Sequence, residues 1–276
     1  MVFDIILLIV GGLVCGVVVN ALADILPYHP FQRPFRYAND APRPFLAWSG
    51  VLAFLTGQRR PAQFPQTPPL AWRYPLTELG VIALFLVAYS IRDTMPGAAT
   101  NPLLLTFFYM AVFVLITVID LEHRLIQFVI MIPMIVLAFV DAALFPPPDI
   151  GEALRGALTG FGVFFALYVG GFGFTYIMGA LRGRKVTTVA FGFGDVMLIT
   201  FAGALLGMAF VIVAMFIAVF LGAVGAGIYL AARLLLRGRY ELFTAIPYGP
   251  YIVAATIVMM LDGRGVWQLI FGYYPF

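Results

Sequence analysis

Two aspartates stand at the ends of long apolar runs, where a charged side chain needs a reason. Asp120 closes the run that ends in LITVID, and Asp195 follows two glycines in AFGFGDVML. An acid exposed to lipid costs about 2.5 to 3.5 kcal/mol on insertion scales, so acids in spans usually face a bundle interior or a water-filled cavity. Two carboxylates that meet share a proton. One can then act as general base on a water while the other donates a hydrogen bond to a peptide carbonyl, which is the chemistry of an aspartyl protease.

Each residue taken alone has a simpler explanation. A lone Asp195 at a span end is more often a solvated interfacial residue or a helix N-cap. Asp120 is spaced to pair with Arg124 at i, i+4 if the helix continues. Gly192 and Gly194 let another backbone approach closely, although glycine is frequent in membrane helices. The catalytic hypothesis therefore depends on these residues acting together.

Composition places both aspartates in a membrane protein. The chain is 63% hydrophobic and 11% charged, contains 27 phenylalanines and has a mean hydropathy of +1.02. These values predict an all-α, polytopic integral membrane protein. The first apolar run, Ile5 to Leu26, has no basic segment before it and no small-residue cleavage pattern before Pro27, so we expect a retained helix. The single cysteine, Cys15, rules out a disulfide framework and a cysteine zinc site.

Charges, prolines and glycines divide the apolar runs into about eight transmembrane helices. The predicted spans are Ile5 to Leu26, Leu76 to Ile91, Leu103 to Asp120, Leu125 to Phe145, Leu158 to Leu181, Asp195 to Gly207, Met208 to Leu234 and Pro247 to Leu261. The boundary between the sixth and seventh spans is the weakest. We expect a single membrane-embedded domain, residues 1–276, with one long loop at 27–75 that is rich in proline and arginine.

The basic residues predict the orientation, because cytoplasmic loops carry the excess of Lys and Arg. With both termini outside the cytoplasm, 13 of the 16 basic residues fall on the cytoplasmic side. They are Arg33, Arg36, Arg43, Arg59, Arg60, Arg73, Arg124, Arg182, Arg184, Lys185, Arg233, Arg237 and Arg239. Asp120 and Asp195 then both lie at cytoplasmic helix ends. The net charge of +3 suits an anionic inner leaflet and is no evidence for nucleic acid binding.

Two other functional classes stay open on the residues alone. Paired intramembrane acids also occur in proton-coupled transporters, whose sites usually lie near the midplane between two related halves. Here the acids lie at helix ends and the sequence shows no internal repeat, which argues against a transporter. A non-catalytic scaffold of a pilus or secretion machine is the third class, and it would tolerate loss of the Asp195 carboxylate.

Five ordered segments resemble one protein family. They are GLVCGVVVNALADILP (12–27), WRYPLTEL (72–79), TVIDLEHRLI (117–126), FGFGD (191–195) and IPYGPYIVAATI (246–257). The chain resembles bacterial prepilin peptidases, the type IV leader peptidase family of GxGD membrane aspartyl proteases. The resemblance runs nearly from end to end.

The resemblance implies that Asp120 and Asp195 are the catalytic pair. It implies a prepilin or a type II secretion pseudopilin as substrate, cut at the cytoplasmic face of the inner membrane to remove a basic leader. For Arg73 and Glu78 we weigh two roles equally. They could form an ion pair at the membrane interface, or they could contact the substrate. Gly192, Gly194, Pro247 and Gly249 are candidates for shaping the site, the last two also being typical of the start of a helix.

The sequence departs from the family in two places, its missing cysteines and Met197. Many members carry two Cys-x-x-Cys pairs in the first cytoplasmic loop, where they would hold zinc, and this loop has no cysteine. Proteolysis needs no cofactor, whereas the family's second activity, N-methylation of the new N-terminus, needs S-adenosylmethionine, and no glycine-rich nucleotide loop supports it here. Met197 stands where the family usually has a lysine. The oligomeric state stays open.

Overall fold

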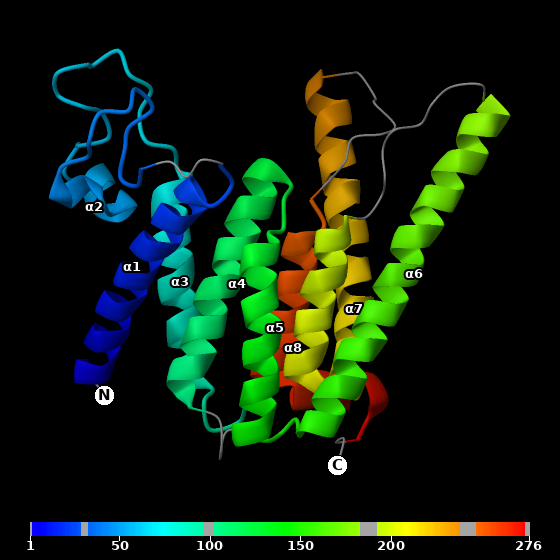
Figure 1. Ribbon diagram of the computed structural model, residues 1–276. Helices are drawn as coiled ribbons and strands as arrows, with labels where there is room; N and C mark the ends of the chain where they lie inside the picture. The colour runs from blue at the N-terminus through cyan, green and yellow to red at the C-terminus, as the bar shows by residue number, and fades with distance from the viewer. Residues whose placement is uncertain (1, 29–32, 96–101, 183–191, 238–246, 274–276) are drawn as a thin grey trace. The chain divides into compact units, whose positions relative to one another are not determined.

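A computed structural model describes residues 2–28, 33–95, 102–182, 192–237 and 247–273, and those ranges contain helices but no strand (Figure 1). The helices are α1 (Val2–Ile25), α2 (Gly50–Leu55), α3 (Arg73–Ser90), α4 (Leu103–His123), α5 (Phe128–Leu144), α6 (Ile150–Arg182), α7 (Phe193–Arg237) and α8 (Gly249–Phe271), with a 3-10 turn η1 (Phe45–Ala47). The all-α prediction is confirmed. Arg184, Lys185 and Arg239 of the predicted cytoplasmic set lie outside the described residues.

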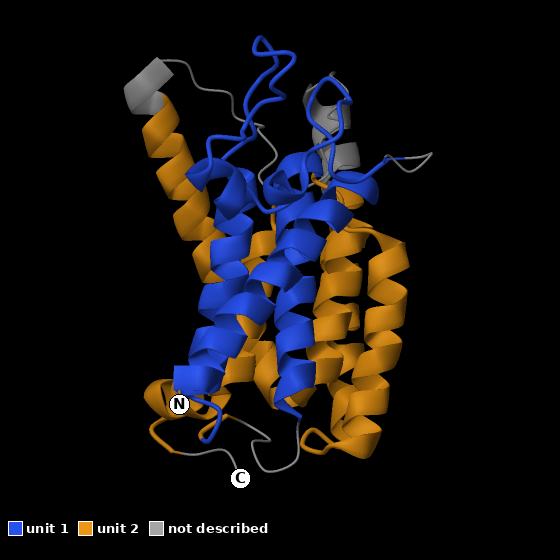
Figure 2. Cartoon of the chain, turned by 90° about the vertical axis from the view of Figure 1, so that its left-hand side faces the viewer, with its two compact units in different colours: residues 1–93, 102–123 blue, residues 94–101, 124–276 orange. Residues whose placement is uncertain are grey.

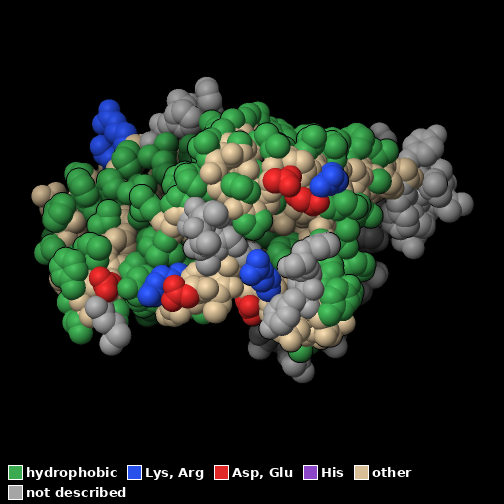
Figure 3. Space-filling model, turned by 90° about the horizontal axis from the view of Figure 1, so that it is seen from below, with side chains coloured by type: hydrophobic (Ala, Val, Ile, Leu, Met, Phe, Trp, Pro, Cys, Tyr) green, Lys and Arg blue, Asp and Glu red, His purple; other side chains and the backbone are tan. Residues whose placement is uncertain are grey.

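Five of the helices are long and apolar enough to cross a membrane: α1, α4, most of α6, most of α7, and α8. The α5 helix is apolar but shorter. A multi-pass membrane protein is therefore confirmed, while eight crossings and the placement of both termini stay predictions. Seen from below, the described side chains are mostly hydrophobic, with a few acidic and basic ones among them (Figure 3).

Gly207 divides α7 at the predicted boundary between two spans. Its φ of 75° and ψ of 173° are non-helical, and glycine adopts a positive φ without the steric cost of a Cβ. Before this break, the charge of Asp195 acts on Tyr248. After it, a Cβ built on Gly222 would lie 2.8 Å from the Tyr248 ring. Asp195 and Gly222 therefore lie near the same residue, so the chain reverses at Gly207.

The chain forms two compact units, coloured separately in Figure 2. The first contains residues 1–93 and 102–123, and the second contains residues 94–101 and 124–276. The first unit therefore includes α1 to α4, and the second includes α5 to α8. The single membrane-embedded domain stays a prediction.

In the first unit, glycines let α1 and α3 pack closely. A Cβ on Gly12 would lie 2.9 Å from the Cα of Ile82, and a Cβ on Gly16 would lie 2.6 Å from the Cα of Glu78. This spacing of four residues is the small-residue motif that brings membrane helices together. The loop between the two helices has a small core of its own, made of Tyr37, Ala47, Ala53 and Leu70.

In the second unit, α6 and α7 pack through a similar close approach. A Cβ on Gly156 would clash with the carbonyl oxygen of Gly203, and a Cβ on Gly160 would lie 2.6 Å from the carbonyl oxygen of Ile199. Further along α6, the ring of Tyr168 meets that of Phe193 at 5.7 Å. These contacts fix the start of α7, and with it Asp195, against α6.

Candidate active site

Asp120 lies in the last turn of α4 and is buried, with 5% of its surface exposed. The helix ends at His123, and Arg124 has a left-handed φ of 53°. The i, i+4 ion pair with Arg124 required a continuous helix, and that premise is wrong. Burial of a carboxylate at a helix end also contradicts a simple solvated position for Asp120.

Asp195 is the third residue of α7 and is also buried, with 8% of its surface exposed. Its Oδ2 accepts a hydrogen bond of 2.9 Å from the amide of Gly192, and its own amide donates to the Gly192 carbonyl at 3.1 Å. This reciprocal pairing resembles a capping box, in which an acid in the first turn bonds back to the residue before the helix. Gly192 thus orients the Asp195 carboxylate. Among the described residues, a Cβ at Gly192 would make only ordinary contacts, so no close approach is found there.

Gly194 has the close-packing role expected of the glycines. A Cβ there would lie 2.7 Å from the Cβ of Ile126 and 3.2 Å from its carbonyl oxygen. The neighbouring rings of Phe128 and Phe193 lie 5.9 Å apart. The segment that carries Asp195 therefore packs against the chain that directly follows α4, the helix of Asp120.

The segment before α8 adds a phenol beside Asp195. Burial, followed by the negative charge of Asp195, raises the pKa of Tyr248 to about 12. Its hydroxyl is therefore protonated at neutral pH. Gly249 begins α8 and Pro250 lies in its first turn, which confirms that the glycine and proline mark the start of a helix. A role for Pro247 and Gly249 in shaping the substrate site stays a prediction.

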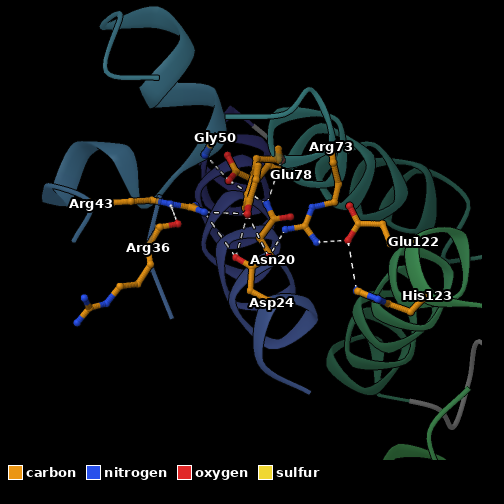
Figure 4. Close-up of polar contacts among 10 residues, drawn as sticks. Asn20, Asp24, Arg36, Arg43, Gly50, Arg73, Glu78, Glu122 and His123 are labelled. Atoms are coloured by element: carbon orange, nitrogen blue, oxygen red, sulfur yellow. Dashed lines mark hydrogen bonds and ion pairs between the residues drawn. The ribbon is translucent and has the colours of Figure 1, made fainter. Parts of the chain in front are cut away.

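Glu78 is completely buried and holds the loop between α1 and α3 against the helices (Figure 4). Its Oε1 accepts hydrogen bonds from the Gly50 amide at 2.6 Å and from Asn20 Nδ2 at 3.3 Å. Its Oε2 accepts from Ser49 Oγ at 2.6 Å and from the Val51 amide at 2.9 Å. The carboxylate thus satisfies the free amides at the start of α2, where a negative charge is favoured.

Arg73 contacts other partners (Figure 4). Its Nη2 bonds to Asp24 of α1, and its Nη1 donates to Glu122 of α4 at 2.8 Å. Arg43 from the loop lies 3.7 Å from Asp24. Both guanidinium groups lie over the Tyr74 ring, Arg43 at 4.3 Å and Arg73 at 4.2 Å.

Arg73 and Glu78, which we considered as an ion pair, each contact other groups. Arg73 bonds to Asp24 and Glu122, whereas Glu78 accepts hydrogen bonds from α1 and from the start of α2. Sequence reasoning missed Asp24, the anion that Arg73 and Arg43 share. A signal was present, because Asn20 and Asp24 are spaced by four residues and so lie on one face of an otherwise apolar helix. Contact of Arg73 or Glu78 with a substrate stays a prediction.

Within the part of the chain that the structure describes, no group of three or more His, Cys, Asp or Glu residues could hold a metal ion. In the loop between α1 and α3, which has no cysteine, side-chain contacts cross-link the chain. Tyr37 donates to the Gln58 carbonyl at 2.8 Å, and the rings of Phe35 and Trp48 stack at 4.4 Å.

Comparison with known proteins assigns a family to this arrangement. A model of the type IV leader peptidase family matches residues 107–227, which include Asp120 and Asp195. The chain is 30% identical over 229 residues to the prepilin leader peptidase/N-methyltransferase of Aeromonas hydrophila, a match that covers 82% of this chain and 69% of the relative. It is 29% identical over 210 residues to the protein of the same name from Xanthomonas campestris, covering 75% of this chain and 64% of the relative. No solved structure matches significantly.

Proposed function

The chain belongs to the type IV leader peptidase family and is a prepilin peptidase, and we propose that it uses Asp120 and Asp195 as a catalytic pair. The substrate in this proposal is a prepilin or pseudopilin whose basic leader is removed by cleavage of one peptide bond. The contact of Gly194 with Ile126 is the observation that carries the proposal.

That contact limits how far apart the two carboxylates can be. Gly194 precedes Asp195, and Ile126 is only six residues after Asp120. Three of those steps are helical, at about 1.5 Å each, and three at most extended, at about 3.6 Å each. The Cα of Asp120 is therefore within about 15 Å of the Cα of Ile126. The proposal is that, within this limit along the chain, the two carboxylates come close enough to hold a water and a peptide bond between them.

The reaction follows from a pair that holds one proton. The ionised carboxylate takes a proton from water as the hydroxyl oxygen attacks the peptide carbonyl carbon, while the protonated carboxyl donates a hydrogen bond to the carbonyl oxygen. The tetrahedral intermediate then collapses, the C–N bond breaks, and the amine leaves with a proton returned by the pair. The Gly192 amide supports this role because it holds one oxygen of Asp195 in a fixed direction.

Cleavage at the cytoplasmic face of the inner membrane is part of the proposal. The excess of basic residues supports it, since reversing the chain would put most of them outside. A reporter that is active only in the cytoplasm should be on when fused within residues 27–75 and off when fused after Phe276. The opposite pattern would contradict the orientation.

The relatives' names include N-methylation, which requires a methyl donor such as S-adenosylmethionine. We assign no described residue to that donor, so the proposal derives no step through it. Proteolysis by two carboxylates needs neither this donor nor a metal, and we expect chelators to leave cleavage unchanged. The same digest can test methylation, by the mass of the new N-terminal fragment with and without the methyl donor.

The deciding experiment removes each carboxylate in turn and measures loss of the leader from a purified prepilin. Asp120→Ala, Asp195→Ala and the double variant should fall to a similar near-zero rate, because the two groups act as one unit and their losses do not add. Asp195→Asn should be equally inactive, since an amide cannot accept the proton of water. If well-folded Asp195→Asn keeps more than about a tenth of the normal rate, less loss than the roughly hundredfold expected for a general base, the mechanism is wrong.

A further inference from the structure

The cytoplasmic loop exposes large apolar side chains although it does not itself cross the membrane. Phe45 is 75% exposed and Leu55 is 78% exposed, and Leu46 and Trp48 are exposed between them in sequence. We call these four side chains of η1, α2 and the turn that joins them the loop face. The loop buries other apolar residues in its own core, so this exposure is selective. Large apolar side chains that remain outside a formed core indicate a surface that meets something other than water.

The hydrogen bonds of Glu78 fix the depth of this surface. Glu78 lies five residues after the start of α3, and its other helical partner, Asn20, lies five residues before the end of α1. At about 1.5 Å per residue, both positions are roughly 7 Å inside the helix ends. The Gly50 amide bonds directly to Glu78, so the first turn of α2 lies at that level and not beyond the helices. Figure 1 shows α2 beside the upper end of α1.

Where the ends of α1 and α3 reach the outer edge of the bilayer, that depth corresponds to the headgroup region. The hydrocarbon core is about 30 Å thick and the whole bilayer about 40 to 45 Å, which leaves about 5 to 7 Å of headgroups on each side. Tryptophan and other amphipathic aromatic rings are enriched at this level, where the ring is covered and its polar atom stays near water. Trp48 fits the pattern because its indole Nε1 donates to the Arg43 carbonyl at 3.2 Å while 38% of its surface is exposed.

The charge of the loop fits one kind of lipid. Between Pro27 and Trp72 the chain carries five arginines and a single acid, Asp40. Arg60 is exposed, and Arg59 lies over the Phe54 ring at 4.0 Å, so its charge stays beside α2. Basic residues near a membrane surface attract anionic lipid by about 1 kcal/mol each.

We propose that the loop face lies in the headgroup region of the membrane that the helices cross, with the exposed Arg33 and Arg60 of the loop on anionic lipid. The loop then binds the membrane as an interfacial element, and its short helix α2 acts as the anchor. This contact would hold the loop at the bilayer surface independently of any substrate. It goes beyond the proposed function and does not depend on the catalytic pair.

The test uses Trp48 as the probe in the full chain. The only other tryptophans, Trp72 and Trp267, are replaced by phenylalanine, and the protein is reconstituted without substrate into vesicles whose acyl chains carry bromine at a shallow or a deep position. We expect blue-shifted emission that shallow bromine quenches strongly, deep bromine quenches less and aqueous iodide hardly quenches. Quenching should increase when phosphatidylglycerol replaces part of the phosphatidylcholine.

Matched variants separate the loop face from the rest of the loop. Leu55→Glu should reduce quenching by shallow bromine and raise quenching by iodide, whereas Gln66→Glu, the same charge on an exposed polar site, should change neither.

Emission quenched only by iodide would overturn the proposal, because the loop would then stand in water. Protection of Trp48 from iodide that appears only after a prepilin is added would also overturn the proposal, because the loop face would then bind the substrate. Protection only at a high protein-to-lipid ratio would overturn it in favour of a second copy of the chain. Equal quenching with and without phosphatidylglycerol would overturn the role of the arginines. Cleavage activity is not measured, so failure here leaves the catalytic proposal untouched.

Discussion

Arg73 Nη1 lies 2.8 Å from Glu122 Oε2, and the other terminal nitrogen of the same guanidinium bonds to Asp24. One side chain therefore joins the end of α1 to the last turn of α4. Glu122 is two residues after Asp120 in that turn. The position of the buried Asp120 carboxylate thus depends on an ionic cross-link made by a residue far away in the sequence.

Arg73→Ala should lower both thermal stability and the rate of leader cleavage. Only 13% of the Arg73 side chain is exposed, and its loss leaves Asp24 without its closest cation. Loss of a partner from a buried polar group costs about 1 to 3 kcal/mol, which predicts a clear fall in Tm. Arg73→Lys should recover part of this loss, because a lysine keeps the charge but cannot contact both acids through two nitrogens. Unchanged Tm and cleavage in Arg73→Ala would contradict a positioning role.

Glu122→Gln should be mild by comparison. The Glu122 side chain is 39% exposed, and exposed ion pairs contribute about 0.2 to 1 kcal/mol. The glutamine oxygen can still accept from Arg73, so most of the cleavage activity should remain. Glu122→Lys places two cations together and should lower activity more. Melting curves and leader cleavage of the two variants, measured together, check this order.

The sequence predicted the helices better than the contacts between them. The predicted spans overlap helical segments because length and apolarity dictate them, and the glycine at 207 predicted the break within α7. Two bounds were missed by more than a turn, since α6 begins at Ile150 and α8 continues to Phe271. The predicted end of α4, at Asp120, is three residues too early. The charged turn DLEH indicates the end of a span, but α4 continues to His123. Networks such as that around Asp24 could not be predicted, since they join residues about 50 positions apart through side-chain geometry that no local pattern encodes.

Gly16→Ala should destabilise the packing of α1 on α3, whereas Gly11→Ala should not. A Cβ at Gly16 would lie 2.6 Å from the Cα of Glu78, a backbone atom that cannot move aside alone. Overpacking of this kind costs about 1 to 3 kcal/mol. A Cβ at Gly11 meets nothing within 4 Å, and alanine there gains about 0.5 to 1 kcal/mol of helix propensity. Thermal melting in detergent should rank Gly11→Ala at or above the parent and Gly16→Ala below it; equal melting of the two variants would contradict the close approach.

Glu78→Gln should release the loop between α1 and α3 from the helices. The Glu78 carboxylate accepts four hydrogen bonds and donates none. In either orientation of its amide, a glutamine would direct its own NH2 group at two of these four donors. Hydrogen bonds to a charged group contribute about 1.5 to 3 kcal/mol each, so the start of α2 should detach. Trypsin should then cut faster between Arg59 and Arg60 in the loop, since the bond after Arg60 precedes Pro61 and resists trypsin.

Glu152→Gln provides the control for Glu78→Gln, since Glu152 is an exposed acid paired with Arg155 on α6. In Glu152→Gln, trypsin should cut the loop between α1 and α3 at the parental rate. If Glu78→Gln also shows parental trypsin sensitivity but a raised KM for prepilin, then Glu78 contacts the substrate and its role in holding the loop is wrong.

Tyr248 predicts how the protein responds to alkali. Burial and the charge of Asp195 raise the pKa of this phenol to about 12 in the folded chain, against about 10 in an unfolded one. A group whose folded pKa is raised contributes stability that is complete below pH 10 and is lost as the pH rises towards 12, because the unfolded chain ionises first. Tyr248→Phe should therefore flatten the fall in Tm above pH 10 while leaving the pH profile of cleavage unchanged in shape between pH 5 and 9, where the phenol does not titrate. An altered profile in that lower range would show that Tyr248 takes part in the proton transfers of the catalytic pair.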